Sequence, residues 1–479
     1  MRNTLFWVVL SVSVLLLPGI LYAQAPYTVW VRTYNGPAFS GAAATSCAVD
    51  AAGNLYVAGS SSNGSNSDFL IIKYNAVTGD TIWVRSYIGS ADDDDGAKDC
   101  AVDNSGYLYV TGYYYNETQD EDYLTIKYNT TTGDTIWSRR YKGTVYANGS
   151  DIAYSCAVDD SGNLYVTGFS SPDYLTIKYN TATGDTIWTR RFSANGFNNS
   201  CDVDGFGNLY VAGTSSGSCL AIKYNAVTGD TIWTKRYEGS GSVHSCAVDG
   251  SGNLYVTASS IVDTSYAFLN IIKYNTAGDT LWTSSYGPVY WLDYANDCVA
   301  DDSGNLYVPY HSYNGANFDY LTIKYNANGD TLWTCRYNSP ADSNDSPSDC
   351  AIDGSGNLYV TGASYNGTSS CLTIKYNTAA GVAGKPNCQM ADNKLQLGQN
   401  IPNPFSQHTV ISYQLPASGP VSLKIYNVAG QLVKTFNMGL QQPGYHQVEW
   451  HDSKIPAGVY FYLLTSGHYQ ATKKLVVVK

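Results

Sequence analysis

Few side chains of this 479-residue chain have the types and spacing that chemistry needs. Residues 28–377 hold two histidines, His244 and His311, and neither has a cysteine or an acidic residue at metal-ligand spacing. Residues 213–217 (GTSSG) match the G-x-S-x-G nucleophile elbow, which needs a strand-to-helix turn. Because 219–225 has the pattern of another strand, we interpret this match as chance in a Ser/Gly loop. With no H-E-x-x-H motif and no phosphate-binding loop, the sequence predicts no catalytic residue and no cofactor.

Four consecutive aspartates are weak candidates for a metal site. Asp92, Asp93, Asp94 and Asp95, with Asp99 nearby, could offer carboxylate oxygens to Ca²⁺. The EF-hand pattern fails because no glutamate stands at its twelfth position. A solvated acidic loop is therefore the favoured interpretation, and no metal is predicted.

An Asp-Thr-Ile/Leu tripeptide, such as residues 80–82, occurs six times in the chain. It resembles a short bacterial O-glycosylation acceptor pattern. The start of a β-strand explains the tripeptide equally well, so both interpretations stay open.

These residues are carried by a repeated unit. Its first half is C-A-V-D-x-x-G-N-L-Y-V-x-G and its second half is L-x-I-K-Y-N-x-x-x-G-D-T-I-W, with a period of 45 to 56 residues. The unit predicts four short strands a to d, for example 100–103, 107–112, 123–129 and 134–141, bounded by Gly, Asn and Asp. In each unit the Asp of C-A-V-D comes before a turn, where a carboxylate accepts backbone N–H groups, so we assign it a structural role. The seven copies begin at Cys47, Cys100, Cys156, Cys201, Cys246, Cys298 and Cys350.

The seventh unit is split between the two ends of the repeat region. It ends at Asn377 without its strand d, whereas 28–34 (TVWVRTY) matches strand d of other units, such as 186–192. An N-terminal strand that completes the last blade leaves no open sheet edge. The sequence therefore predicts an all-β fold in which a seven-bladed β-propeller is closed by the N-terminal strand.

Eleven cysteines raise the question of disulfides, which are common in exported proteins. Seven occupy one repeat position, which in a propeller lies beyond the Cα distance that a disulfide bridges. We interpret these seven as small buried hydrophobic residues. A bridge among the remaining four, Cys219, Cys335, Cys371 and Cys388, is possible, and the pairing stays open.

The N-terminus has the pattern of a secretory signal peptide. Arg2 precedes an apolar run over 5–20, and Leu-Tyr-Ala at 21–23 is a cleavage site before Gln24. A membrane anchor is the alternative interpretation, but the apolar run over 5–20 is shorter than the ~20 residues that span a bilayer. The net charge of −12, without a Lys/Arg-rich run, argues against a nucleic-acid partner. We expect a monomer with no transmembrane segment in the mature chain.

The D-x-x-G-N-L-Y-V and I-K-Y-N-x-x-G-D-T-x-W segments resemble the bacterial β-propeller repeat family often named for seven-bladed propellers. The resemblance covers roughly residues 28–377. It implies the fold and almost nothing about activity.

The C-terminal region differs in composition from the repeats. It opens with LGQNIPNPF, continues with VSLKIYNVAGQLV and GYHQVEW, and ends with PAGVYFY and KKLVVVK. These short alternating strands predict a small Ig-like β-sandwich. The segments closely resemble the type A C-terminal sorting domain of the type IX secretion system, which implies the secretion machinery as a partner and a secreted or surface-attached product. A carbohydrate-binding or stalk sandwich is the alternative. We expect a signal peptide at 1–23, a propeller at 24–377, a linker at 378–393 and a sorting domain at 394–479.

The d–a and b–c connections vary between units, and antiparallel alternation places both on one side of the ring, here called the variable rim. Loops on rigid scaffolds carry function, and aromatic side chains suit glycans or peptides. The competing explanation is that Tyr is abundant, with 43 copies. The predicted ligand-binding residues are Tyr113, Tyr114, Tyr115, Tyr290, Trp291, Tyr294, Tyr310 and Tyr313.

The favoured function is an exported, non-enzymatic binding module for an unidentified glycan, peptide or protein ligand. The alternatives are an extracellular polymer lyase or hydrolase and a purely structural envelope component. Carboxylates clustered in the central channel would favour the enzyme, and aromatic residues spread over a flat rim would favour binding.

Overall fold

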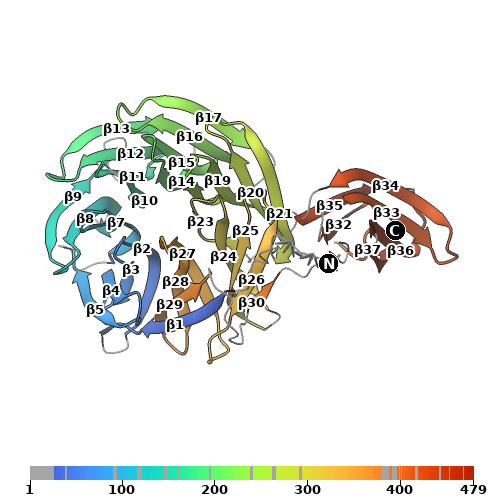
Figure 1. Ribbon diagram of the computed structural model, residues 1–479, viewed down its shortest axis with the longest axis horizontal. Helices are drawn as coiled ribbons and strands as arrows, with labels where there is room; N and C mark the ends of the chain where they lie inside the picture. Colours follow the sequence, from blue (N-terminus) through green and yellow to red (C-terminus); the bar gives the residue numbers. More distant parts are fainter. Residues whose placement is uncertain are drawn as a thin grey trace, which may run out of the picture.

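The computed structural model describes residues 26–478, except 38–39, 90–93, 116–120, 144–148, 160, 194–195, 238–240, 262–265, 291–293, 315, 379–387, 391–395, 399, 401, 416–418, 442–443, 453 and 468. The regular elements of the described part are β-strands (Figure 1). The predicted signal peptide and the candidates Asp92, Asp93 and Trp291 lie outside the described residues.

Each sequence unit folds into an antiparallel sheet whose strands follow chain order, and these sheets are arranged around a central axis (Figure 1). The first three sheets are β2–β5 (Ala42–Val49, Asn54–Ser62, Ser67–Asn75, Thr81–Tyr87), β6–β9 (Gly96–Val102, Tyr107–Tyr115, Glu121–Asn129, Thr135–Tyr141) and β10–β13 (Asp151–Val158, Asn163–Ser170, Asp173–Asn180, Thr186–Phe192). The next two are β14–β17 (Gly196–Val203, Asn208–Ser215, Ser218–Asn225, Thr231–Tyr237) and β18–β21 (Val243–Val248, Leu254–Ile261, Tyr266–Tyr274, Thr280–Tyr290). The following sheet contains β22 (Tyr294–Ala295), β23 (Val299–Ala300), β24 (Leu306–Tyr313), β25 (Phe318–Tyr325), β26 (Thr331–Tyr337) and β30 (Cys388–Met390). The last contains β27 (Asp345–Ile352), β28 (Asn357–Tyr365), β29 (Ser369–Asn377) and β1 (Tyr27–Tyr34).

The hydrogen bonds in the turn between the first two strands explain why the same polar residues recur in each unit. In the first unit the Asp50 carboxylate accepts hydrogen bonds from the backbone N–H of Asn54 at 2.8 Å and from the Tyr56 hydroxyl at 2.9 Å. Gly53 has φ +76°, a conformation that glycine adopts without steric cost. The same Asp-to-Tyr contact recurs in the next unit between Asp103 and Tyr109, at 2.9 Å. The structural role predicted for this Asp is confirmed.

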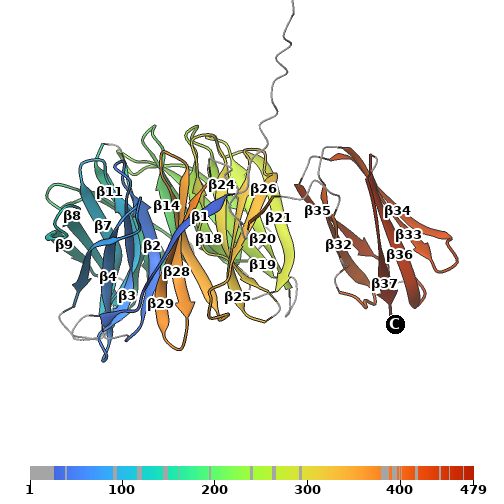
Figure 2. The ribbon, with the colours of Figure 1, turned by 60° about the horizontal axis from the view of Figure 1, so that its bottom comes forward.

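The N-terminal strand completes the last sheet, as predicted. β1 pairs antiparallel with β29, which gives the strand order β1-β29-β28-β27, and Figure 2 shows β1 in blue beside the orange strands. Each innermost strand contacts the innermost strand of the next sheet, and β27 contacts β2. The first and last units are therefore neighbours.

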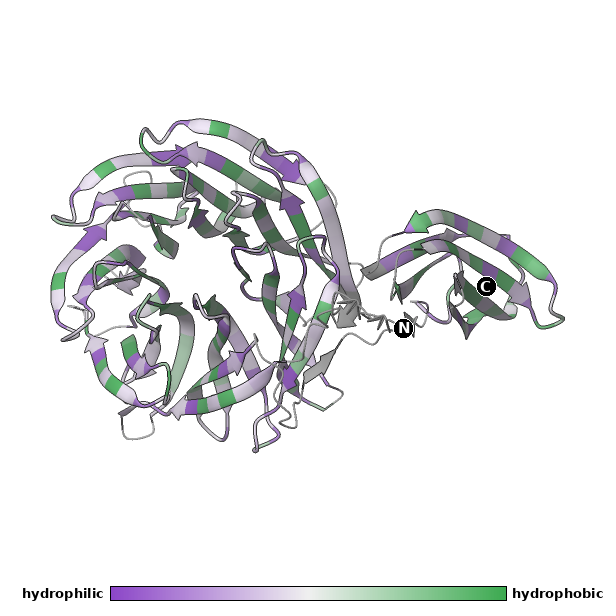
Figure 3. Cartoon of the chain, viewed as in Figure 1, coloured by the Kyte–Doolittle hydropathy of each residue, from purple (hydrophilic) through white to green (hydrophobic). Residues whose placement is uncertain are grey.

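The second and third strands of a unit are more deeply buried than its outermost strand. The second and third strands of a unit are buried on both faces, whereas in the outermost strands β5 and β9 the tryptophan is buried and the other residues are exposed or half-buried. Figure 3 shows that hydrophilic (purple) and hydrophobic (green) residues both occur along the outermost strands. Strands that lie between neighbouring sheets need apolar residues on both faces.

The repeat cysteines are free and buried, which confirms their interpretation as core residues. Cys219 and Cys371 are also buried and are not disulfide-bonded. Cys335 is disulfide-bonded, and its Cα partner across the β26–β30 ladder is Cys388. The predicted linker thus contributes a short strand, β30, to the edge of a propeller sheet.

The C-terminal region forms two sheets that share one core. One sheet has the order β31-β32-β35 and the other β34-β33-β36-β37. The core takes Ile411 and Trp450 from the first sheet and Leu423, Tyr462 and Leu475 from the second. In Figure 1 this region lies beside the propeller, where β21 contacts β35. The strands are β31 (Gln396–Leu397), β32 (His408–Leu415), β33 (Gly419–Asn427), β34 (Leu432–Gln441), β35 (Gly444–His451), β36 (Gly458–Ser466) and β37 (Tyr469–Val477).

Candidate functional site

The candidate site is built from the residue that precedes each repeat cysteine. An innermost strand has no neighbour on its channel side, so its N–H groups there need other acceptors. A β-bulge at this point, such as that between Ala97 and Asp99, re-aims the side chain. The residues at this position are all Ser or Asp: Ser46, Asp99, Ser155, Ser200, Ser245, Asp297 and Asp349.

These side chains connect each unit to the next. The Asp99 carboxylate accepts the backbone N–H of Cys156 at 2.7 Å, and the Ser155 hydroxyl accepts that of Cys201 at 3.1 Å. The Asp349 carboxylate accepts the N–H of Cys47 at 2.6 Å, which joins the last unit to the first. This ring of hydrogen bonds gives the Ser and Asp residues a structural role between the innermost strands.

Four of the carboxylates line one cavity of about 210 Å³ in the channel. Asp99, Asp297 and Asp349 occupy the position before the cysteine, and Asp202 occupies the position after it. The backbone N–H of Cys350 lies 2.7 Å from Asp349 Oδ1 and 3.2 Å from Asp297 Oδ2, so these two carboxylates are close neighbours. Lys98 and His244 line the same cavity. The cavity is thus polar and rich in acidic groups.

Burial determines the ionisation of these groups. Burial, together with the nearby charge of Asp297, raises the pKa of Asp349 well above its usual range. Burial raises the pKa of Asp202 to about 7, and it also raises the pKa of Asp99. Burial lowers the pKa of Lys98 and lowers that of His244 to about 4, so His244 is neutral at physiological pH. At pH 7 the cavity therefore holds protons that a bound cation could displace.

Aromatic rings extend from the cavity towards the variable rim on two sides. On one side Lys98 Nζ lies 5.2 Å from the centroid of the Tyr113 ring, which meets Tyr115 edge-to-face at 6.0 Å. On the other side, the rings run in series from His244 to Tyr294 (6.1 Å), His311 (5.0 Å), Phe318 (4.1 Å) and Tyr313 (5.3 Å). Four predicted rim residues, Tyr113, Tyr115, Tyr294 and Tyr313, thus lie in two half-buried groups that lead to the channel.

Two of the predicted rim residues, Tyr114 and Tyr310, have buried side chains. Tyr114 is 6 % exposed, and its hydroxyl donates to Asp122 at 3.2 Å. Tyr310 is 1 % exposed and stacks on Tyr286 at 5.9 Å. Successive residues of a strand point to opposite faces, so β7 and β24 present Tyr115 and His311 on one face and bury Tyr114 and Tyr310 on the other. For Tyr290 the structure gives the backbone position, opposite Tyr266 in the β20–β21 ladder.

The described part of the acidic loop is a structural element. Asp95 is 2 % exposed and accepts the backbone N–H groups of Gly89 at 2.6 Å and Tyr115 at 3.1 Å. Asp94 accepts the N–H of Ser67 at 2.7 Å. The interpretation of a solvated loop is therefore wrong for Asp95, whose carboxylate fixes the loop conformation. The 213–217 segment joins strands β15 and β16 in a hairpin, so the nucleophile elbow is absent there, as predicted.

The sequence analysis predicts no functional role for the channel carboxylates, because a residue that recurs in the repeat is explained by the fold. The signal was present in the sequence: the residue before the cysteine is Ser in four units and Asp in three, and unit four reads C-D-V-D where most units read C-A-V-D. Residues that vary inside a constant repeat are the ones that a shared fold does not explain. Asp202 is the clearest case, because the equivalent position is Ala in five of the other units.

The fold and the channel define a class, the β-propellers, and the comparisons with known proteins agree. Residues 401–478 match the secretion system C-terminal sorting domain, and residues 121–285 match the outer membrane protein assembly factor BamB. A search of curated proteins finds no match. The chain is thus a β-propeller repeat protein that carries a type IX secretion sorting domain, and it is delivered to, or attached at, the cell surface.

Solved structures resemble the chain in fold at low sequence identity. PorZ, a surface component of the type IX secretion system of Porphyromonas gingivalis, is 17 % identical with a TM-score of 0.46 over 93 % of this chain, which spans 60 % of PorZ. Kuenenia stuttgartiensis hydrazine synthase is 11 % identical with a TM-score of 0.51, over 68 % of this chain and 93 % of that one. The Dos1 propeller is 9 % identical with a TM-score of 0.44, over 75 % and 96 %. Within the described residues, no helix has the length and hydropathy needed to cross a membrane.

The raised carboxyl pKa values predict the pH dependence of stability. The folded state raises the pKa of Asp202 to about 7, so it holds that proton more tightly than the unfolded chain does. The stabilisation is complete at low pH and is lost as the pH rises through about 7. We expect the melting temperature, measured by circular dichroism without ligand, to fall by at least about 2–4 °C between pH 5.5 and 8.5. Asp202→Ala, which restores the repeat residue, should reduce this fall, and an unchanged profile would contradict the assignment.

Proposed function

We propose that residues 24–377 form a closed seven-bladed propeller that binds a basic peptide segment at its channel, and that the Ig-like sandwich at 394–479 delivers it to the surface. The signal peptide 1–23 is removed on export, and the sorting domain is cleaved in the linker 378–393. The propeller acts as a non-enzymatic binding module and a monomer. The ring of innermost-strand contacts, closed by β27 on β2, supports the blade count.

The observation that carries this proposal is the set of four carboxylates around one cavity of about 210 Å³. The described residues contribute two basic side chains to its lining, Lys98 and His244, and burial lowers the pKa of both, that of His244 to about 4. An acidic, partly enclosed cavity attracts cations, and a lysine or arginine side chain is of a size to enter it. Binding of the cation favours the ionised carboxylates and releases protons.

The aromatic groups at the mouth suit the rest of such a ligand. Tyr113 and Tyr115 on one side, and Tyr294 and Tyr313 on the other, offer ring faces and edges that pack against a peptide and attract cationic groups. The match of residues 121–285 to an outer membrane protein assembly factor also favours a polypeptide ligand, since assembly of a protein requires contact with one.

An acid–base hydrolase is the second candidate, and the neighbouring Asp297 and Asp349 carboxylates are the observation that favours it. Two adjacent carboxyl groups that share a proton can divide acid and base roles. Two features weigh against this candidate. Both carboxylates accept backbone N–H groups that hold adjacent units together, and the cavity is smaller than the roughly 300–1,000 Å³ of typical small-molecule sites.

The test is a peptide array probed with the full mature chain, in which basic, neutral and acidic peptides are compared alongside a glycan array. We expect binding to basic peptides. Tyr115→Ala and Tyr313→Ala should each weaken it by about 1–3 kcal/mol, the range for aromatic anchors. Ser161→Ala, in an exposed a–b turn on the opposite side of the ring, is the matched control and should bind like the wild type.

Equal binding to acidic and basic peptides, or a glycan hit that basic peptides do not compete with, would contradict the proposed ligand. Hydrolysis of a polysaccharide or peptide that Asp297→Asn abolishes would establish the second candidate instead.

A further inference from the structure

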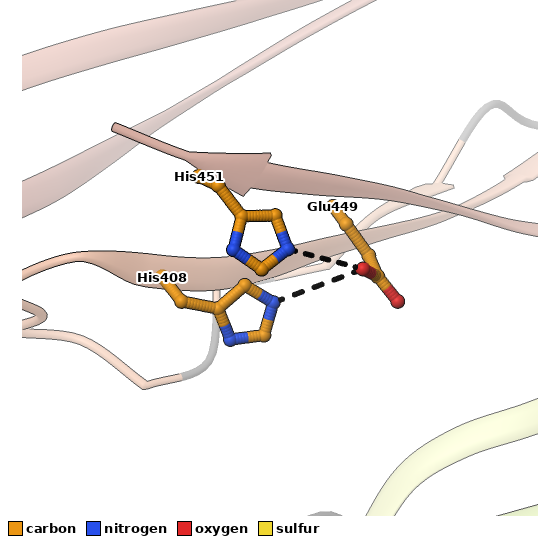
Figure 4. A group of neighbouring side chains, drawn as sticks. All are labelled: His408, Glu449 and His451. Carbon is orange, nitrogen blue, oxygen red and sulfur yellow. Dashed lines mark hydrogen bonds and ion pairs between the residues drawn. The ribbon is translucent and has the colours of Figure 1, made fainter. Parts of the chain in front are cut away.

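Two histidines and a glutamate lie together on the outer face of the sorting domain (Figure 4). His408 is the first residue of β32 and His451 the last of β35, and they are directly opposite in the antiparallel register. Glu449 lies two residues before His451, so its side chain projects from the same face. Trp450, between them, points into the core on the other face. The backbone alone therefore places the three side chains side by side.

The distances between the potential ligand atoms of the three side chains are close to those found around a bound metal ion. The imidazole centroids are 4.1 Å apart, with the rings stacked at 23°. Glu449 Oε2 lies 3.3 Å from His451 Nε2 and 4.0 Å from His408 Nε2. Around a tetrahedral Zn²⁺ with bonds of ~2.0–2.1 Å, neighbouring ligand atoms are about 3.3 Å apart. Small side-chain rotations would complete the geometry without movement of either strand.

The donor atoms also suit a transition metal. Two imidazole nitrogens and one carboxylate oxygen form the set that binds Zn²⁺ with a fourth position open to water, and imidazole selects such metals over Ca²⁺ or Mg²⁺. His408 Nε2 is shielded from solvent and makes no hydrogen bond. A buried polar atom without a hydrogen bond is unfavourable, and a metal ion would supply the missing interaction. The His451 side chain is 67 % exposed, so an ion can enter from solution.

We propose that His408, Glu449 and His451 bind one Zn²⁺ ion on the sorting domain. The ion joins the first residue of β32 to the last residues of β35 and thereby clamps the ends of the two strands. The site is independent of the channel and of its proposed ligand, because the three residues belong to the other domain.

The test is a Zn²⁺ titration of the uncleaved chain, residues 24–479, without a polyhistidine tag and after treatment with a chelator, in competition with a chromophoric chelator at pH 7.5. We expect one Zn²⁺ per chain. His408→Ala and His451→Ala should each weaken binding by at least about tenfold, since loss of even a supporting group around zinc has that effect. Glu449→Gln, which keeps the shape of the side chain, should also weaken it. Zn²⁺ should raise the melting temperature of the wild type and leave that of the two alanine variants unchanged.

His446→Ala is the matched control, because His446 lies on the same strand but pairs with Tyr413 instead of His408. This variant should bind Zn²⁺ as the wild type does. Wild-type affinity in both His408→Ala and His451→Ala would overturn the proposal, and so would a loss of affinity in His446→Ala equal to theirs. Weak binding of several ions with no change in melting temperature would mean adventitious surface binding and would also overturn it.

Discussion

Replacement of Trp30 by alanine is expected to lower the free energy of unfolding of the propeller by about 3–5 kcal/mol. Trp30 lies on β1, the strand that completes the last sheet, and is 7 % exposed. Its ring packs between Tyr74 of the first unit and Tyr359 of the last, at 6.3 and 6.1 Å. Its indole N–H donates to the backbone oxygen of Ala76 at 3.1 Å. The substitution therefore opens a cavity where the two ends of the repeat region meet.

Urea denaturation followed by tryptophan fluorescence and circular dichroism measures this loss. Val29→Ala is the matched control, because Val29 is the adjacent residue of the same strand and is 42 % exposed. It should change the stability by less than about 0.5 kcal/mol. A chain that lacks residues 24–35 should lose stability further, because β29 would become an open edge. If that chain melts at the wild-type temperature, the N-terminal strand does not close the ring.

Deletion of residues 394–479 is expected to abolish surface delivery while the propeller still folds. The two C-terminal sheets have a core of their own, and its described residues all lie between Leu397 and Val477. The truncated protein should accumulate in the periplasm, and the melting temperature of its propeller should be unchanged. Cell fractionation and protease accessibility of intact cells measure its location. Mass spectrometry of the wild-type mature protein should find a C-terminus within residues 378–395.

Point variants test whether export requires a folded sorting domain, since they leave the domain in the chain. Trp450→Ala removes a ring that is 1 % exposed at the centre of the core, so export should fail as in the deletion. Val428→Ala changes a residue that is 73 % exposed, and export should continue. Surface delivery of the truncated chain, or a mature protein that still ends at Lys479, would contradict this account of the tail.

The repeated sequence predicted the β-strand scaffold because its residues form turns and strand pairs within a single unit. The Asp50 turn and the pairing of β1 with β29 followed from patterns within one unit and from the strand that the last unit lacks. Side-chain direction was harder to predict. Tyr113, Tyr114 and Tyr115 are the same residue type. Because successive side chains of a strand point to opposite faces, Tyr114 is buried against Asp122.

The channel could not be predicted unit by unit. Asp99 and Asp349 are 250 residues apart in sequence, and only closure of the ring brings their charges into one cavity. The hydrogen bond from Cys47 to Asp349 likewise depends on contact between the first and last units. The site is thus a property of the assembled ring, although the Ser/Asp variation that marks it is visible in each repeat.

The affinity for a basic peptide at two pH values tests the central claim most directly. The full mature chain is titrated calorimetrically with tetralysine, whose side chains stay charged, at pH 6 and pH 8, beside Asp202→Ala and Ser161→Ala. We predict that the wild type and Ser161→Ala bind about tenfold more tightly at pH 8, because the ionised fraction of a carboxyl group with a pKa of about 7 rises about tenfold between these values. Asp202→Ala should bind weakly and lose most of this pH dependence. Equal affinity at both pH values, or an Asp202→Ala variant that binds like the wild type, would contradict the claim that the acidic channel binds a cationic ligand.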